Sequence, residues 1–165
     1  MQHLVLLNRG NNMEFVYLAD YPEAIPIIAK WYYNQWGHLH GLDSQKTSEE
    51  MLADYLSWDT MPLLILAREE DEIIGAVQLK YYEMDIYPQK EHWLGGVYVV
   101  EQHRGKKIAE KLVLRAMDTA KSFGVDTLYL QTEKIDGGLY KRLTWKPVEK
   151  VKYRNKHVLI MKKVL

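Results

Sequence analysis

The chain has no cysteine, no excess of charge of either sign and no long apolar run. Without cysteine it can form no disulfide, thiolate nucleophile or Cys-based zinc site. The 22 basic and 22 acidic side chains cancel, whereas proteins that coat nucleic acid carry a large positive excess. The apolar run from Leu4 to Leu7 is far shorter than the roughly 20 residues of a membrane span. We therefore expect neither a nucleic-acid nor a membrane partner.

What remains is the composition of one globular domain. The 165 residues are 47% hydrophobic and 27% charged, which suits a single domain with its own core. We expect this domain to span residues 13–165. Residues 1–12 end in the turn-like Gly10-Asn11-Asn12 and form either an extension or an extra edge strand. The start lacks the basic residues and cleavage site of a signal peptide, so the expected location is cytoplasmic.

Strand-like and helix-like segments alternate along the domain. Strands are predicted where β-branched and aromatic residues gather, and helices where apolar residues recur every three to four positions. The expected strands are 13–19, 63–67, 73–82, 92–100, 127–132, 147–153 and 158–163, and the expected helices are 20–36, 47–56, 108–123 and 138–143. This order predicts an α/β (α+β) fold in which helices cover both faces of a mixed sheet.

Capping residues mark the first two helix starts. Asp20 precedes Tyr21-Pro22-Glu23 and predicts an N-cap for a helix that ends at Gly37. Thr47 and Glu50 have the spacing of a capping box, which places the start of the next helix at Thr47.

The most informative segment is a strand, a basic turn and a helix in direct succession. The turn carries Arg104, Lys106 and Lys107 around Gly105. The first N–H groups of a helix have no internal partner, and the helix dipole is positive at that end. Together with three cations these N–H groups predict a phosphate or pyrophosphate site. A solvated basic turn with no ligand is the alternative.

Two motifs here resemble those of the GNAT N-acetyltransferase superfamily. The segment 104–109 (RGKKIA), five residues after a Val-Tyr-Val strand, resembles the family's R/Q-x-x-G-x-G/A signature. The segment 139–145 (LYKRLTW) resembles its L-Y-x-k-l-G-F/W segment, and the element order matches from residue 13 to 165. The resemblance implies a mostly antiparallel sheet of about six to seven strands with about four helices. It also implies that this sheet is splayed at the fourth and fifth strands.

The resemblance further implies acetyl-CoA as co-substrate and a small-molecule or peptide amine as acceptor, with no metal and a possible homodimer. The pantetheine arm would bind backbone of the fourth strand beside a bulge at Gly95-Gly96, and the pyrophosphate would bind the turn and helix start. The residues implied in acetyl-CoA binding are Gly96, Val97, Tyr98, Val99, Arg104, Gly105, Lys106, Lys107, Ile108 and Ala109.

The sequence departs from the family pattern at two glycine positions. Lys107 stands where the signature has glycine, so the N–H is kept and a positive charge is added. Thr144 replaces the glycine of the L-G-F/W turn. We expect Thr144 either to avoid a positive φ or to be mildly strained.

Four side chains are catalytic candidates. Tyr140 occupies the position of the family's general acid, and a phenol of pKa about 10 suits protonation of a thiolate. Glu91, thirteen residues before Arg104, has the spacing of the glutamate base found in one branch of the family. Glu83 and His92 are nearby alternatives, and ordered water is a fourth way to deprotonate the amine.

The acceptor side is expected at the first two helices, their connecting loop and the segment 81–87. An aromatic, acidic pocket there would suit a cationic amine, and scattered aromatics without a shared pocket are the alternative. The pair His38 and His40 lacks a third metal ligand. The side chains expected on this side are Trp31, Tyr32, Trp36, His38, His40, Tyr81, Tyr82 and Tyr87.

The predicted function is transfer of an acetyl group from the CoA thioester directly to a primary amine through a ternary complex, since no cysteine could carry the acyl group. A non-catalytic acyl-CoA-binding domain of the same fold is the alternative. A nucleotide-binding domain is remote, because neither G-x-x-x-x-G-K-[ST] nor G-x-G-x-x-G occurs.

The zero net charge is the sum of two halves of the sequence that carry opposite net charges. Residues 1–101 carry 16 acidic and 6 basic side chains, whereas residues 102–165 carry 6 acidic and 16 basic ones. The division falls just before the expected phosphate turn. We therefore expect the basic half to meet the phosphates and the acidic half to contain most of the acceptor side.

Overall fold

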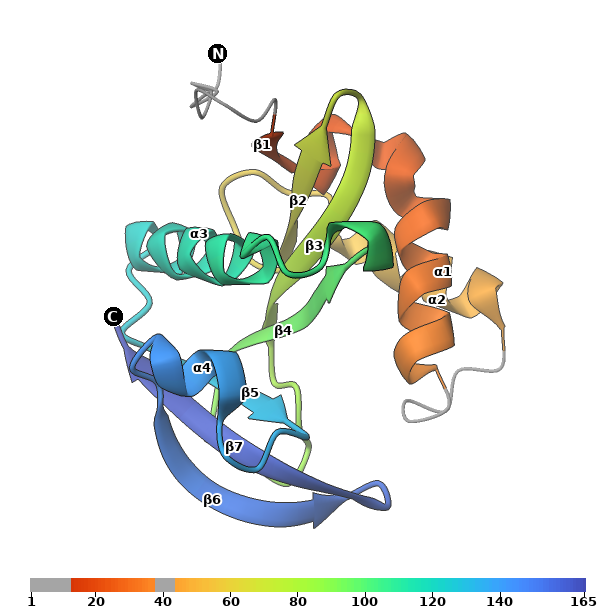
Figure 1. The fold of residues 1–165 in the computed structure, drawn as a ribbon. Coiled ribbons are helices and arrows are strands. Elements are labelled where there is room, and N and C mark those ends of the chain that lie inside the picture. Colours follow the sequence, from red (N-terminus) through yellow and green to blue (C-terminus); the bar gives the residue numbers. More distant parts are fainter. Residues whose placement is uncertain (1–12, 38–43) are drawn as a thin grey trace.

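The computed structural model describes residues 13–37 and 44–165. Seven strands form one sheet in the order β1-β2-β3-β4-β5-β7-β6 (Figure 1). The strands are β1 (Met13–Tyr17), β2 (Leu63–Glu69), β3 (Glu72–Tyr81), β4 (His92–Val99), β5 (Thr127–Thr132), β6 (Lys146–Tyr153) and β7 (Lys156–Val164). The helices are α1 (Ile25–Trp36), α2 (Gln45–Leu52), α3 (Ile108–Ser122) and α4 (Gly138–Arg142), with 3₁₀ turns η1 (Leu18–Asp20), η2 (Pro22–Ala24), η3 (Ala53–Tyr55) and η4 (Glu101–His103).

The sheet opens between β4 and β5. Every other neighbouring pair of strands is antiparallel, but β4 and β5 are parallel and share a single registered pair, Trp93 with Tyr129. Beyond this pair the two strands diverge, which leaves backbone of β4 without a strand partner on that side. The predicted mixed sheet, splayed at its fourth and fifth strands, is confirmed.

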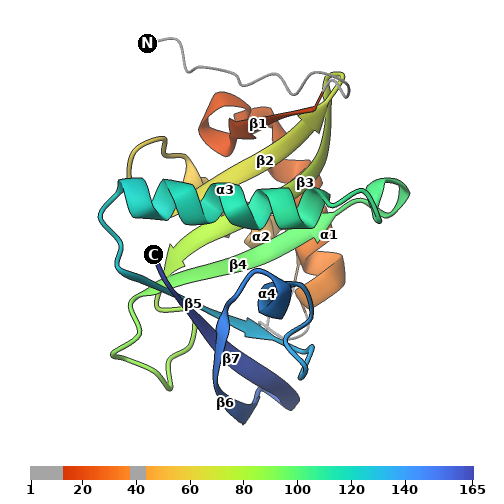
Figure 2. The same cartoon turned by 60° about the vertical axis from the view of Figure 1, so that its left-hand side comes forward.

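Helices cover both faces of the sheet, with α3 on one face and α1 with α2 on the other (Figure 2). Alternate side chains of a strand point to opposite faces. Leu63 and Ile65 of β2 therefore join the α3 core, whereas Leu64 and Leu66 join the α1 core. Burial on both faces explains why β2 reads as a continuous apolar run.

The predicted N-cap at Asp20 is wrong. The first strand ends at Tyr17, and two 3₁₀ turns precede α1, which begins at Ile25. Pro26 lies in the first turn of α1, where its missing N–H removes no helical hydrogen bond. The Asp20 carboxylate instead accepts a hydrogen bond of 2.7 Å from Trp58 Nε1.

The predicted capping box at Thr47 is also displaced. The second helix begins at Gln45, and Ser44 is its N-cap. The Ser44 hydroxyl accepts a hydrogen bond of 3.2 Å from the Thr47 N–H, so Thr47 lies inside the first turn. Both residues carry a capping hydroxyl, and the extended backbone of Ser44 (φ −161°) makes it the cap.

Some expectations fall outside the described residues. The predicted extension 1–12 and the pair His38 and His40 both lie there. Within residues 13–37 and 44–165, no helix is long and apolar enough to cross a membrane. The same residues contain no group of three His, Asp or Glu side chains arranged to hold a metal ion.

Candidate functional site

A β-bulge interrupts β4 at the splay. Ala76 of β3 pairs with Tyr98 and Gln78 pairs with Gly95, so Gly96 and Val97 together face one residue of β3. Gly96 has φ +58°, in the left-handed region. The bulge expected beside Gly95-Gly96 is therefore present.

Side chains hold this bulge from the α1 face. The Tyr32 hydroxyl donates a hydrogen bond of 2.7 Å to the Gly96 carbonyl. A Cβ on Gly96 would lie 2.8 Å from both Gln78 Oε1 and Tyr32 Oη, closer than real contacts allow. Glycine is thus required here by its backbone conformation and by the close approach of its neighbours.

The second part of the site is the turn that leads from β4 into α3. Gly105 has φ +83°, and nothing lies within 4 Å of the position of a Cβ on it. Lys107 precedes α3 and makes no side-chain capping hydrogen bond. The first N–H groups of α3, including those of Ile108 and Ala109, have no intrahelical partner. This open turn at a helix N-terminus suits an anion.

Arg104 is held by the protein itself. Its Nε donates a hydrogen bond of 2.9 Å to the Val99 carbonyl, and its guanidinium lies 5.5 Å from the ring centre of Tyr98. Both contacts tie the turn to the end of β4. Arg104 therefore fixes the shape of the turn, and Lys106 and Lys107 are the cations that extend from it.

The two residues that replace glycines of the family pattern both adopt a strained, left-handed backbone conformation. Lys107 has φ +62° and Thr144 has φ +66°. Of the two alternatives for Thr144, the strained turn is the one observed. A left-handed conformation costs an ordinary residue about 1–2 kcal/mol, and most for a β-branched side chain such as threonine.

Tyr140 lies on α4, partly buried against Trp145 with the two rings edge-on at 6.1 Å. Burial raises the pKa of Tyr140 from its ordinary value of 10.0 to about 12. The phenol is therefore protonated at neutral pH and is a hydrogen-bond donor.

The three candidate bases occupy different places. Glu83 lies beside the splay: one oxygen accepts a hydrogen bond of 3.0 Å from Gln131 Nε2, and the other forms an ion pair with Lys80. The position of a Cβ on Gly95, next to the bulge, is 3.7 Å from Glu83 Oε2. The Glu83 side chain is only 9% exposed.

Glu91 and His92 lie at the other end of β4. Glu91 precedes the strand and is 52% exposed, and its Oε1 is 3.9 Å from His92 Nε2. His92 pairs with Tyr81 at the end of the ladder. At about 3.3 Å per residue, His92 is roughly 13 Å along the strand from Gly96. Of the three candidates, the structure brings Glu83 to the bulge.

Sequence reasoning missed Lys80, Gln78 and Gln131. A signal for the first two was present in IIGAVQLKY, where polar residues at alternate positions interrupt an otherwise apolar strand. Their common parity places them on one face of β3. Gln131 carries no comparable signal, because the end of β5 is polar throughout.

The aromatic side chains expected on the acceptor side divide into separate groups. Tyr32 lies at the bulge with Trp36 packed against it, and Trp31 stacks on Tyr98 at 5.0 Å. Tyr87 joins a different core cluster and hydrogen-bonds to Glu149, and burial is the main cause that raises its pKa to about 12. The exposed members of the set are Tyr81 and Tyr82.

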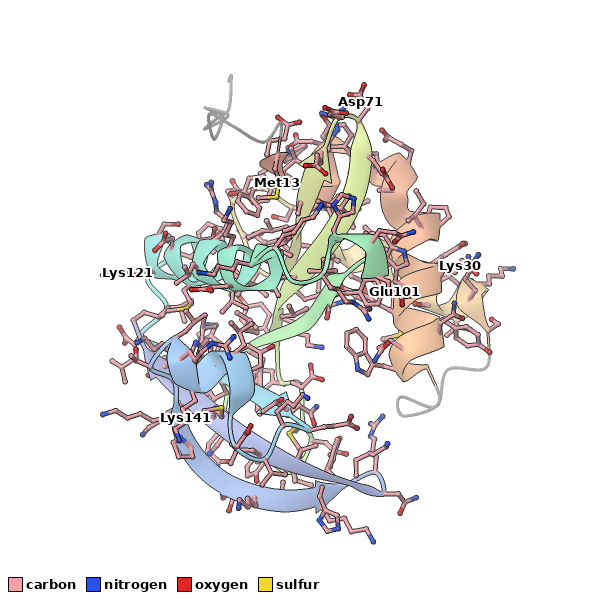
Figure 3. The ribbon with its side chains drawn as sticks, viewed as in Figure 1. Met13, Lys30, Asp71, Glu101, Lys121 and Lys141 are labelled. Atoms are coloured by element: carbon pink, nitrogen blue, oxygen red, sulfur yellow. The ribbon has the colours of Figure 1, made fainter. Side chains whose placement is uncertain are left out.

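An open groove of about 570 Å³ lies between α1 and the tip of the β2–β3 hairpin, and its lining includes Val100 and Gln102, just after β4. Trp31 is its one member from the expected acceptor set. Figure 3 places Asp71, one of its acidic residues, at the hairpin tip, far from Lys141 on α4. The bulge at Gly96 and the turn of residues 104–107, here called the anion turn, are the parts of the structure that correspond to the acetyl-CoA site expected from the sequence.

Comparison with known proteins agrees with this geometry. The model of the acetyltransferase (GNAT) family matches residues 17–144. No curated protein matches the chain.

Similar solved structures include three acetyltransferases. An aminoglycoside 6'-acetyltransferase type Ii is 19% identical, with a TM-score of 0.69, and the match covers 91% of this chain and 96% of that one. The putative acetyltransferase yncA from Salmonella typhimurium, solved with acetyl-CoA, is 18% identical, with a TM-score of 0.71 and coverage of 94% and 95%. A ribosomal-protein-alanine N-acetyltransferase from Brucella melitensis is 18% identical, with a TM-score of 0.68 and coverage of 93% and 99%.

These identities are low, so the structures show a shared fold and leave the acceptor open. The family model, by contrast, matches well over half of the chain and includes the bulge, the anion turn and α4. This chain therefore belongs to the GNAT family of acetyltransferases.

Proposed function

We propose that the protein is an N-acetyltransferase that moves an acetyl group from acetyl-CoA directly to a primary amine. The observation that carries the proposal is the bulge at Gly96, which lies in the splay on the strand that leads to the anion turn. Acetyl-CoA is a long molecule with the thioester at one end and a pyrophosphate further along. Its binding site therefore needs a free strand edge for the pantetheine arm, followed by an anion site for the pyrophosphate. Residues 96–109 offer both.

The described residues fit acetyl-CoA. The backbone of Gly96, Val97, Tyr98 and Val99 would hold the pantetheine arm, where β4 has left β5. The N–H groups of residues 105–109 would hold the pyrophosphate, since the turn is open above Gly105. Lys106 and Lys107 would add two positive charges. When bound, acetyl-CoA supplies the activated acyl group.

Transfer to a protonated acceptor, R–NH3+, requires that its nitrogen lose two protons in all. A new N–C bond forms while the C–S bond of the thioester breaks; one proton goes to solvent and one to the departing sulfur. Tyr140 is the proposed acid. Because its pKa is raised to about 12, it would act mainly by donating a hydrogen bond to the sulfur. The backbone N–H near Val97 would polarise the thioester carbonyl.

Glu83 is the proposed partner of the acceptor ammonium. Lys80 and Gln131 hold its carboxylate beside the bulge, where it would bind the ammonium and pass a proton to solvent directly or through water. Glu91 and His92 remain alternatives from the sequence. Neutral variants of the three, Glu83→Gln, Glu91→Gln and His92→Gln, separate them: the base is the residue whose loss lowers kcat most and removes the acidic limb of the pH profile.

The proposed function is tested by calorimetry with acetyl-CoA and by release of free CoA over a panel of amines. We expect acetyl-CoA to bind and to raise the melting temperature, while NADH and ATP do not. Binding without CoA release from any amine would favour a non-catalytic acyl-CoA-binding domain. No binding of acetyl-CoA would refute both functions.

A further inference from the structure

A lysine and a glutamate form an ion pair in the interior of the splay. Lys80 contacts Glu83, and their side chains are only 16% and 9% exposed. Burying two charges costs several kcal/mol per ion before their attraction is counted. A well-packed apolar pair of similar size would hold a fold at least as well. A pair at this place is therefore better explained by a ligand than by stability.

Both members have unused hydrogen-bonding capacity. The Lys80 ammonium has three N–H donors, and among the described residues Glu83 is its ion-pair partner, while the Tyr55 phenol interacts with it electrostatically. Each Glu83 oxygen has two acceptor positions, of which Gln131 and Lys80 occupy one apiece. The pair can therefore bind a donor and an acceptor at the same time.

The ion pair lies next to the bulge, and it can lie there because Gly95 has no side chain to occupy the same space. A Cβ on Gly95 would lie 2.8 Å from Lys80 Cε and 3.1 Å from Lys80 Nζ. The lysine stem thus crosses the backbone of β4 directly before Gly96. The face involved is the one that Tyr32 of α1 contacts, opposite α3. An acceptor reaching the thioester from the α1 side would meet this ion pair.

We propose that Lys80 and Glu83 form a paired-charge subsite, which selects an acceptor that carries a carboxylate next to its primary amine, as an α-amino acid does. This inference rests on the proposed acetyltransferase function. The acceptor ammonium meets Glu83 and its carboxylate meets Lys80, so the four charges alternate. Because the two protein charges touch, they match an acceptor whose own charges are separated by one carbon. A polycation gains little from a pair with no net charge.

The test compares each L-amino acid with its amide and with the amine that lacks the carboxylate, measured as CoA release at saturating acetyl-CoA. For the best amino acid, we expect kcat/KM to exceed that of both analogues by about 10–100-fold, the range of one charged hydrogen bond. Spermidine serves as the polycation. The wild-type result alone overturns the inference if the amide or spermidine is the better acceptor.

Variants of Lys80 then test whether this side chain causes the preference for the amino acid over its amide. Lys80→Met should lower kcat/KM for the amino acid about 10–100-fold more than for its amide, which also loses activity because Lys80 holds Glu83, and should leave the KM of acetyl-CoA unchanged. Lys80→Arg should restore part of the preference. Lys30→Met, at an exposed lysine of α1, is the matched control and should change neither value.

Lys80→Met leaves the Glu83 charge buried without its partner, so this variant could lose activity by misfolding. A second variant separates that effect from the loss of acceptor binding. The double variant Lys80→Met/Glu83→Gln removes both charges and should stay folded by circular dichroism. It should bind acetyl-CoA normally but bind the amino acid no better than its amide in calorimetry. Equal losses for amino acid and amide would overturn the inference. The proposed function would survive that result, because it depends only on acetylation of some amine.

Discussion

Replacement of Gly96 by alanine tests the bulge most sharply. The left-handed conformation at φ +58° costs a residue with a Cβ about 1–2 kcal/mol. The new methyl group would lie 2.8 Å from Tyr32 Oη, so the hydrogen bond to the Gly96 carbonyl should be lost, at about 1 kcal/mol. Alanine also restricts the unfolded chain, which returns roughly 0.5–1 kcal/mol. The expected net loss is about 1–2.5 kcal/mol.

Urea denaturation of wild type and Gly96→Ala measures this loss directly. For a chain of this length each kcal/mol lowers Tm by about 2–4 °C, so the melting temperature should fall by about 2–10 °C. The control is Gly105→Ala, because Gly105 also has a positive φ but has no neighbour within 4 Å of the Cβ position. The control variant has only the conformational strain. If Gly96→Ala were no less stable than Gly105→Ala, the close approach of Tyr32 and Gln78 would be refuted.

Three further predictions concern single side chains. Tyr140→Phe should lower kcat at least tenfold and leave the KM of acetyl-CoA within about threefold; unchanged kcat near neutral pH would remove Tyr140 from the acid role. Because the pKa of Tyr140 is about 12 when folded and 10.0 when unfolded, the protein loses stability as pH rises above 10, so by pH 11 wild type should lose about 1.4 kcal/mol more than Tyr140→Phe. Thr144→Gly should change the free energy of unfolding by less than about 1 kcal/mol in urea, because relief of φ +66° is offset by the looser unfolded chain and by loss of the hydroxyl's hydrogen bonds with the Leu143 carbonyl and Lys163; a larger change of either sign would contradict this.

The sequence predicted the fold well because its signals were local. Clusters of β-branched and aromatic residues placed the strands, and the splay implied by the family resemblance appeared where β4 and β5 share one registered pair. The errors lie at helix starts. Asp20 and Thr47 carry capping groups, but Pro26 and Ser44 determine where α1 and α2 begin. Several nearby residues can cap a helix, and tertiary contacts such as Trp58 on Asp20 select between them.

The parts of the candidate site that consist of backbone were predictable from the sequence, whereas the parts that depend on contacts between side chains were less predictable. The glycines of the bulge and the anion turn were visible in the sequence, because glycine marks special backbone geometry. The arrangement of the candidate bases was not, because sequence spacing favoured Glu91 and left Glu83 as a nearby alternative. Their separation depends on the β3–β4 loop, which returns Glu83 to Lys80 and Gln131 while Glu91 stays exposed. Such contacts between distant residues exist only in the folded chain.

The proposed activity of this chain is the transfer of an acetyl group from acetyl-CoA to a primary amine. It can be measured by incubating the protein with acetyl-CoA and a panel of amines, with free CoA followed by thiol titration and the acceptor by mass spectrometry. We expect one CoA to be released for each acetyl group gained by an amine, and a large loss of this activity in Tyr140→Phe. CoA release with no acetylated amine, or no release with any acceptor, would contradict it.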